Sequence, residues 1–139
     1  MTSTLSDRDQ IIERLAELAA ALDRRDWDAL GAMFAPSATG YRSTGRDEIV
    51  ATVRAHLGGC GPSQHLLGNH RVEIRGDEAR SLTYARVHHR GKGTAEGLAY
   101  ECFGEYEDRW TRTPDGWRIT SRVFTLSHDL GDFAVLQPG

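Results

Sequence analysis

The chain has 139 residues, of which 39% are hydrophobic and 27% are charged, an ordinary composition for a single globular domain over 1–139. Its 20 acidic residues outnumber its 17 basic residues, giving a net charge of −3, and the basic residues form no stripe. This balance gives no electrostatic reason to expect a nucleic-acid or membrane partner. The chain is long enough to bury a core without disulfides or metal.

The N-terminal segment and the cysteines point to an intracellular protein. The first ten residues are polar and lack the apolar centre of a signal peptide. No apolar run approaches the roughly 20 residues that span a bilayer. Cys60 and Cys102 lie in neither a CxxC pair nor a zinc-ligand spacing, which favours two reduced thiols. We therefore expect a cytoplasmic location.

Two helices are predicted at the start of the chain. Ser6 can cap a first helix that runs to about Asp23, since apolar residues recur there at helical spacing. Asp26 can cap a second, short helix in which Trp27 and Phe34 share one face. Pro36 is expected to end it.

The remaining elements are one more helix and a meander of strands. After a short extended stretch over 37–43, Gly45 precedes a third helix that the glycine-rich segment 58–62 ends. The pattern then changes to period two, with turns at 76–77 and 114–116. The first predicted strand begins near residue 64. The later strands are predicted over 81–90, 98–113 and 117–128.

This order predicts an α+β fold. Helices that precede an antiparallel meander segregate to one face of the sheet. Long strands with short hairpins favour a strongly bent sheet, so the helices would close one side of a cone and leave a pocket. No internal repeat or second domain is evident in the sequence.

Four segments in this order resemble the SnoaL-like branch of the NTF2-like superfamily: ALDRRDWDALGAMFAP, GRDEIVATVRAHL, SQHLLGNHRVEI and DRWTRTPDGWRITSR. The resemblance implies a cone-shaped α+β barrel, no cofactor, and assembly into trimers or dimers. It does not fix the function, because this fold hosts dehydratases, isomerases, cyclases, epoxide hydrolases and proteins without activity.

Within the branch, the chain is most similar to scytalone dehydratase and to the bile-acid and halocyclohexane lyases. Those enzymes pair an aspartate at the end of the first helix with a histidine at the start of the sheet, where Asp23 and His65 stand here. The resemblance also implies catalytic roles for Tyr41, in GYRS, and for His89, in RVHH.

Two positions depart from that pattern, so the same substrate is not expected. Leu22 stands where a tyrosine precedes the aspartate, and Glu107 stands where an asparagine precedes the tryptophan of the third long strand.

The residue types themselves favour proton transfer. A carboxylate held against an imidazole makes a base of useful strength near pH 7, as expected for Asp23 and His65. Aspartate is unfavourable at a helix C-terminus, which suggests a second reason for its presence. His88 and His89 must point to opposite faces of one strand. Only His89 shares a face with the smaller residues Ala85 and Val87.

Arg122 and Phe124 are predicted to share a strand face, opposite Ile119 and Val123. An arginine inside the cone would bind an anion or an enolate-like oxygen. The candidate partners for such an arginine are the glutamates that alternate on the neighbouring strand, namely Glu101, Glu105 and Glu107. The candidate substrate-binding residues are Trp27, Phe34, Arg122 and Phe124.

These observations lead to a cofactor-independent lyase or isomerase, of dehydratase type, acting on a small apolar cyclic or polyketide-like molecule. The alternatives are a non-catalytic binding module of the same fold, a polyketide cyclase, or an epoxide hydrolase. The last ranks low, because no Asp-Arg-Asp set is evident. The six histidines show no metal-ligand spacing and no nucleotide-binding motif is present, so neither metal nor cofactor is expected.

The expected partners are a small-molecule substrate and further copies of the chain. An open sheet face with aromatic and β-branched residues would be a large exposed patch, which favours a homo-oligomer, either trimer or dimer.

Overall fold

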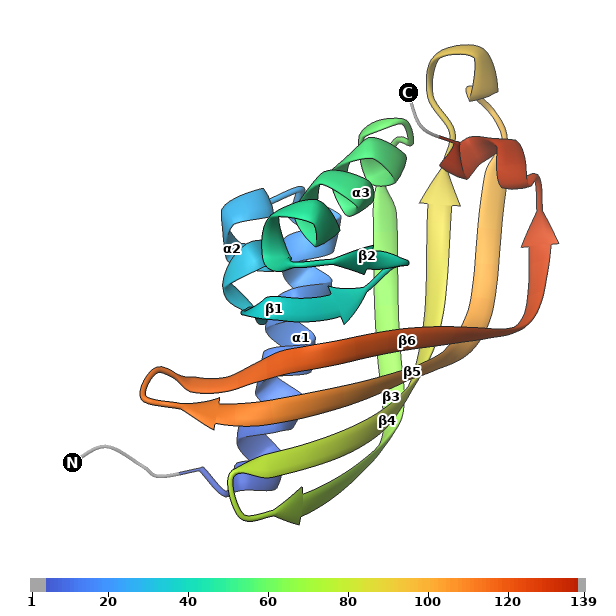
Figure 1. Cartoon of the computed structure of the whole chain (residues 1–139). Helices are drawn as coiled ribbons and strands as arrows, with labels where there is room; N and C mark the ends of the chain where they lie inside the picture. The colour runs from blue at the N-terminus through green and yellow to red at the C-terminus, as the bar shows by residue number, and fades with distance from the viewer. Residues whose placement is uncertain (1–4, 138–139) are drawn as a thin grey trace.

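The computed structural model describes residues 5–137, so the first four residues of the polar N-terminal segment lie outside it. Three helices pack against one side of a strongly bent six-stranded sheet (Figure 1). The elements are α1 (Asp7–Arg24), α2 (Trp27–Ala32), β1 (Phe34–Gly40), β2 (Ser43–Thr44), α3 (Arg46–Gly58), β3 (Ser63–Arg75), β4 (Glu78–Arg90), η1 (Gly93–Ala95), β5 (Ala99–Thr113), β6 (Gly116–Gly131) and η2 (Phe133–Leu136).

The sheet has the strand order β2-β1-β6-β5-β4-β3. The four long strands form an antiparallel meander, whereas β1 runs parallel to β6. The predicted α+β class, with helices on a curved and mainly antiparallel sheet, is confirmed. In Figure 1 the long strands bend around the helices, so the sheet has a concave face toward them and a convex outer face.

Helix α1 begins at the predicted cap and ends within about one residue of the predicted end. The Ser6 side chain accepts a hydrogen bond from the Asp9 amide, and the buried face of the helix packs against β3. Arg25 ends the helix in a left-handed conformation with φ 59°, and its N–H bonds the carbonyls of Ala21 and Leu22. Asp23 therefore lies in the last turn, next to the first residues of β3.

The second helix ends earlier than predicted. Helix α2 stops at Ala32, and Phe34, which was expected on its apolar face, is the fully buried first residue of β1. The physical reason is pairing with a strand far along the chain: Phe34 lies opposite Ile119, whose amide donates to the Met33 carbonyl. Pro36 is exposed in β1, so it does not end the helix.

A bulge in β6 overturns the predicted alternation of its side chains. Ile119 pairs with Trp110 and Ser121 pairs with Arg109, which leaves Thr120 as an extra residue. Ile119 and Arg122, predicted on opposite faces, are therefore both buried. Val123 lies outside with 54% of its surface exposed.

The core fills the space between the helices and the concave face of the sheet. Its largest fully buried side chains include Trp110 and Trp117, and the Trp110 indole donates to the Ser81 hydroxyl over 2.9 Å. Cys60 and Cys102 are buried free thiols. At the C-terminal end, Val135 of η2 is buried as well. Over residues 5–137, no helix has both the length and the apolar composition that crossing a membrane requires.

Gly104 is a point of close approach between β5 and β6. A Cβ atom there would overlap the Phe124 ring and the Thr125 carbonyl oxygen. Phe124 also packs on Tyr106 with ring centroids 4.9 Å apart, so the Phe124 ring has a second close neighbour.

We predict that Gly104→Ala lowers the free energy of unfolding by about 1–3 kcal/mol through overpacking. Gly68→Ala is the matched control, because a Cβ atom at Gly68 meets nothing within 4 Å, and it should change stability by less than about 0.5 kcal/mol. Urea denaturation measures both, and equal stabilities of the two variants would contradict the prediction.

Candidate active site

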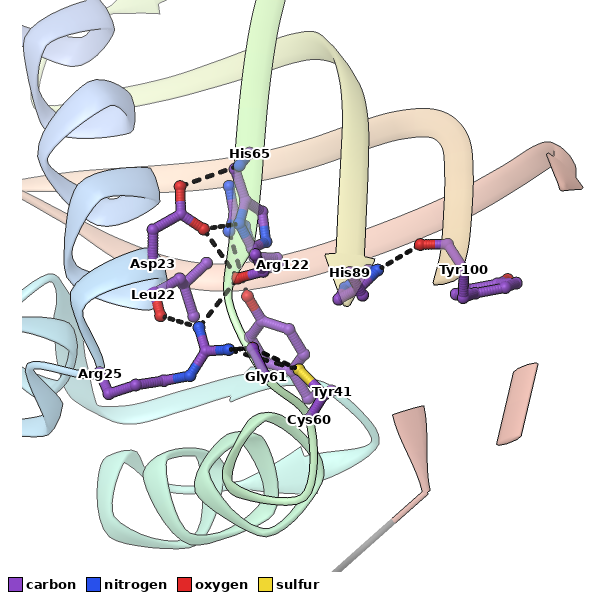
Figure 2. A network of polar contacts seen from close by, with 11 residues as sticks. Leu22, Asp23, Arg25, Tyr41, Cys60, Gly61, His65, His89, Tyr100 and Arg122 are labelled. Atoms are coloured by element: carbon purple, nitrogen blue, oxygen red, sulfur yellow. Dashed lines mark hydrogen bonds and ion pairs between the residues drawn. The ribbon is translucent and has the colours of Figure 1, made fainter. Parts of the chain in front are cut away.

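The structure brings Asp23 and His65 into direct contact where α1 meets β3 (Figure 2). Asp23 Oδ1 lies 2.7 Å from His65 Nδ1, and Oδ2 accepts the His65 backbone N–H over 2.9 Å. Ser63, two residues earlier on the same strand face, donates its hydroxyl to Oδ1 over 3.0 Å. The carboxylate thus receives three hydrogen bonds from two residues of β3.

The proton between Asp23 and the imidazole belongs to His65. Burial raises the pKa of Asp23, but the hydrogen bonds from the His65 ring and backbone and from Ser63 outweigh this effect and lower the pKa below its ordinary value. An ionised carboxylate can only accept, so Nδ1 must carry the hydrogen. In the neutral form of this ring, the lone pair is therefore on Nε2.

The Nε2 atom of His65 is not fully enclosed, although most of the side chain is buried. The His65 side chain is only 6% exposed, and Nε2 makes no hydrogen bond among the described residues. Within the same residues, no fully enclosed side-chain nitrogen or oxygen lacks a hydrogen-bond partner. Nε2 therefore borders accessible space, as a base must if it is to reach a substrate.

His89 lies next to this pair on the concave face. Its ring centroid is 6.3 Å from that of His65, and its Nδ1 lies 3.1 Å from the Tyr100 carbonyl oxygen, which can only accept. Burial lowers the pKa of His89, and the hydrogen bond to Tyr100 only partly opposes this effect. Nδ1 of His89 therefore carries a hydrogen, and the lowered pKa favours the neutral form of the ring. His88 points to the outer face, where it lies 3.7 Å from Glu101.

Arg122 is buried on the concave face, and its partner is a different carboxylate from those predicted. Its Nε and Nη2 donate to the two oxygens of Asp108, over 2.8 and 3.2 Å. The glutamates Glu101, Glu105 and Glu107 lie on the alternate positions of β5, and Glu107 pairs with Arg80. The expectation of a glutamate partner was therefore wrong, because the inward-facing residue of this stretch is Asp108.

The charge of Arg122 is fixed by its surroundings. Burial lowers the pKa of this guanidinium, but the adjacent Asp108 carboxylate outweighs burial and raises it. The guanidinium carbon also lies 3.7 Å from the centroid of the Tyr106 ring, a cation–π contact.

Tyr41 is held against Arg122 by a strained turn. Tyr41 and Arg42 have φ values of 52° and 61° and join Gly40 to Ser43 in the β1–β2 hairpin. Such a turn ordinarily takes glycine or asparagine. The Tyr41 hydroxyl accepts a hydrogen bond from Arg122 Nη1 over 3.1 Å. Its own hydrogen is therefore free to donate elsewhere.

A hollow of about 550 Å³ opens beside Tyr41 and Arg122 and is also lined by Phe124. The other two aromatic residues predicted to bind substrate do not line it. Phe34 lies in the core with its ring centroid 6.5 Å from that of Tyr41, and Trp27 packs half-buried at the start of α2. The structure thus brings together Tyr41, Arg122 and Phe124.

Sequence reasoning missed three polar residues of the site. Ser63 could have been found from its spacing, because it precedes His65 by two on a strand and must share its face. Asp108 and Arg25 gave no such signal. Asp108 required the exact register of β5, and Arg25 contacts Ser63 across the α1–β3 junction.

Comparison with known proteins places this chain in a family. The SnoaL-like domain model matches residues 3–123. The chain belongs to the SnoaL-like family. An uncharacterized protein of Mycobacterium tuberculosis is 34% identical to this SnoaL-like protein over 127 residues, which cover 87% of this chain and 86% of the relative.

Solved structures share the fold at low sequence identity. A candidate aromatic ring hydroxylase from Novosphingobium aromaticivorans has a TM-score of 0.85 at 23% identity, covering 98% of this chain and 100% of its own. A candidate scytalone dehydratase from the same organism has a TM-score of 0.79 at 19% identity, covering 89% and 86%. A hexachlorocyclohexane dehydrochlorinase from Novosphingobium barchaimii has a TM-score of 0.78 at 14% identity, covering 90% and 89%. The NTF2-like fold is thereby shown.

The buried pair makes a prediction about stability. Arg122→Met leaves Asp108 buried without its partner and should lower the free energy of unfolding by about 3–5 kcal/mol. The double variant Arg122→Met/Asp108→Leu removes both charges and should recover part of this loss. Urea denaturation measures the two variants, and a double variant less stable than Arg122→Met would contradict the pairing.

His89 makes a prediction about pH. Its pKa is lowered from 6.5, so below about pH 6.5 the unfolded chain takes up a proton that the folded chain does not. The stability present above that pH is lost as the pH falls toward the folded-state pKa. When the pH is lowered from 7.5 to 5.5, the free energy of unfolding should therefore fall more in wild type than in His89→Asn. The asparagine amide keeps a hydrogen-bond donor for the Tyr100 carbonyl oxygen. Urea denaturation at both pH values tests this, and equal losses would argue against it.

Proposed function

We propose that this SnoaL-like protein is a cofactor-independent acid–base enzyme of the lyase or isomerase type. Its substrate would be a small, mostly apolar, cyclic or polyketide-like molecule with an acidic C–H bond. The observation that carries the proposal is the contact of Asp23 with His65 Nδ1, which leaves Nε2 as a base bordering accessible space.

In the proposed step, His65 Nε2 removes a proton from carbon next to a carbonyl or aromatic ring. Asp23 stabilises the imidazolium that forms, as the acidic member of a triad does. The Tyr41 hydroxyl, supported by Arg122, donates to the oxygen on which negative charge develops. The electron pair of the broken C–H bond then forms a double bond. In elimination the C–O bond breaks and the departing hydroxide takes the proton from the His65 imidazolium, leaving as water. In isomerisation the imidazolium returns this proton to a different carbon of the substrate, so the double bond shifts.

The geometry favours a specific role for His89. A neutral imidazole with its hydrogen on Nδ1 presents a bare Nε2, which accepts hydrogen bonds and cannot protonate a leaving group. In the proposal His89 therefore binds a hydroxyl or N–H of the substrate, and Tyr41 is the group that assists departure of hydroxide.

The structural comparisons support elimination chemistry. The names of the scytalone dehydratase and hexachlorocyclohexane dehydrochlorinase relatives denote loss of water and of hydrogen chloride. Both reactions require a base placed to remove a proton from carbon. An epoxide hydrolase is less well supported. Asp108 is fully buried and both of its oxygens accept from Arg122, so it is not placed to activate water.

The test is a panel of small cyclic ketones with a hydroxyl β to the carbonyl, followed by ¹H NMR in D₂O. Wild type should exchange the α-proton and release water from a member of the panel. His65→Gln should slow this turnover by about 10²–10⁴-fold, and Asp23→Asn should also slow it, while ligand affinity stays within a few-fold.

His88→Gln is the matched control, because His88 lies on the outer face of the same sheet. A binding module would give a different result: ligand would bind to wild type without exchange or water loss, and the His65 and Asp23 variants would bind it equally well.

A further inference from the structure

Arg25 is a charged side chain at the site that the proposed chemistry does not use. Its guanidinium lies half-buried between the end of α1 and the start of β3 (Figure 2). Nη1 donates to the Leu22 carbonyl over 2.7 Å and to the Ser63 hydroxyl over 2.8 Å. Nη2 donates to the Gly61 carbonyl over 2.6 Å and lies 3.3 Å from Cys60 Sγ.

The direction of the hydrogen bonds from Arg25 to the Asp–His pair is fixed by chemistry. A guanidinium can only donate, so the Ser63 oxygen accepts from Arg25. The single hydroxyl hydrogen of Ser63 is then committed to Asp23 Oδ1, which is also the acceptor for His65 Nδ1. The Arg25 guanidinium polarises the Ser63 hydroxyl, which strengthens the hydrogen bond from Ser63 to Asp23 in a partly buried site.

We propose that Arg25 is a positioning residue that acts through Ser63 to fix the Asp23 carboxylate and, with it, the ring of His65. The inference rests on the proposed role of the Asp23–His65 pair. Arg25 contacts Ser63 rather than the imidazole, so it orients the base without taking part in the proton transfer.

The shape of arginine suits this role. Its planar guanidinium presents donors in a fixed fork, so one side chain reaches the Leu22 and Gly61 carbonyls and the Ser63 hydroxyl together. A lysine ammonium is a point donor on a flexible stem and cannot hold all three in one plane. The left-handed backbone at Arg25 is unfavourable for a residue with a side chain, yet it is retained here at the helix end.

The experiment compares Ser63→Ala and Arg25→Met with wild type, and uses Arg24→Met as the matched control. Arg24 is the adjacent, exposed arginine in the last turn of α1. The first readout is the exchange rate of the His65 Nδ1 hydrogen with water, measured by ¹H–¹⁵N NMR at pH 8.5, where imidazoles are ordinarily neutral. The second readout is kcat and KM on the substrate found in the panel.

We expect exchange of this hydrogen to be about tenfold faster in Ser63→Ala and Arg25→Met, consistent with the loss of one hydrogen bond to a charged group. Arg25→Lys should rescue part of the effect, and Arg24→Met should match wild type. In Ser63→Ala, kcat should fall by up to about 100-fold with KM nearly unchanged, because the base is misplaced while substrate contacts remain.

Exchange rates in Ser63→Ala and Arg25→Met equal to that of Arg24→Met would overturn the proposal and leave Arg25 as a structural tie between α1 and β3. If Arg25→Met unfolds, Ser63→Ala decides alone, because it keeps the Arg25 contacts with Leu22 and Gly61. Failure of the proposed function is distinguishable: the ring hydrogen would still respond to Ser63→Ala, whereas turnover would be insensitive to His65→Gln.

Discussion

The structure depends on the hydrogen bonds that hold the Asp23 carboxylate at the junction of α1 and β3. A carboxylate in the last turn of a helix faces the negative end of the helix dipole. Here three hydrogen bonds from Ser63 and from the ring and backbone of His65 offset that cost. The same contacts set the helix against the first long strand and leave His65 Nε2 as the free nitrogen. Fold and candidate chemistry therefore share one set of hydrogen bonds.

The concave face repeats one arrangement at two places. Near α1, the guanidinium of Arg25 lies behind Ser63 and Asp23. Near the β1–β2 turn, the guanidinium of Arg122, neutralised by Asp108, lies behind the Tyr41 hydroxyl. In the proposed function, the first place presents a base and the second presents a hydrogen-bond donor, and partial burial strengthens the hydrogen bonds at both. A base and a hydrogen-bond donor are the two groups that elimination or isomerisation next to a carbonyl needs.

How much could be predicted from the sequence depended on the range of the interaction. Helical spacing and period-two alternation located the helices and long strands, and the family pattern pointed to Asp23 and His65. The errors arose where distant parts of the chain decide the local structure. Phe34 joins β1 because β6 pairs with it, and Ile119 and Arg122 lie on the same side of β6 because Thr120 forms a bulge. Asp108 was missed because one residue of register separates it from Glu107.

The most direct test of the central claim is the tautomer of His65 in the wild-type protein, read from its two ring ¹⁵N shifts at pH 8.5. If Asp23 holds the ring as described, Nδ1 carries the hydrogen and Nε2 has the shift of an unprotonated nitrogen. The opposite tautomer, with hydrogen on Nε2, would mean that Asp23 does not accept from the ring. Nε2 could not then act as the base, and the proposed proton abstraction would be wrong.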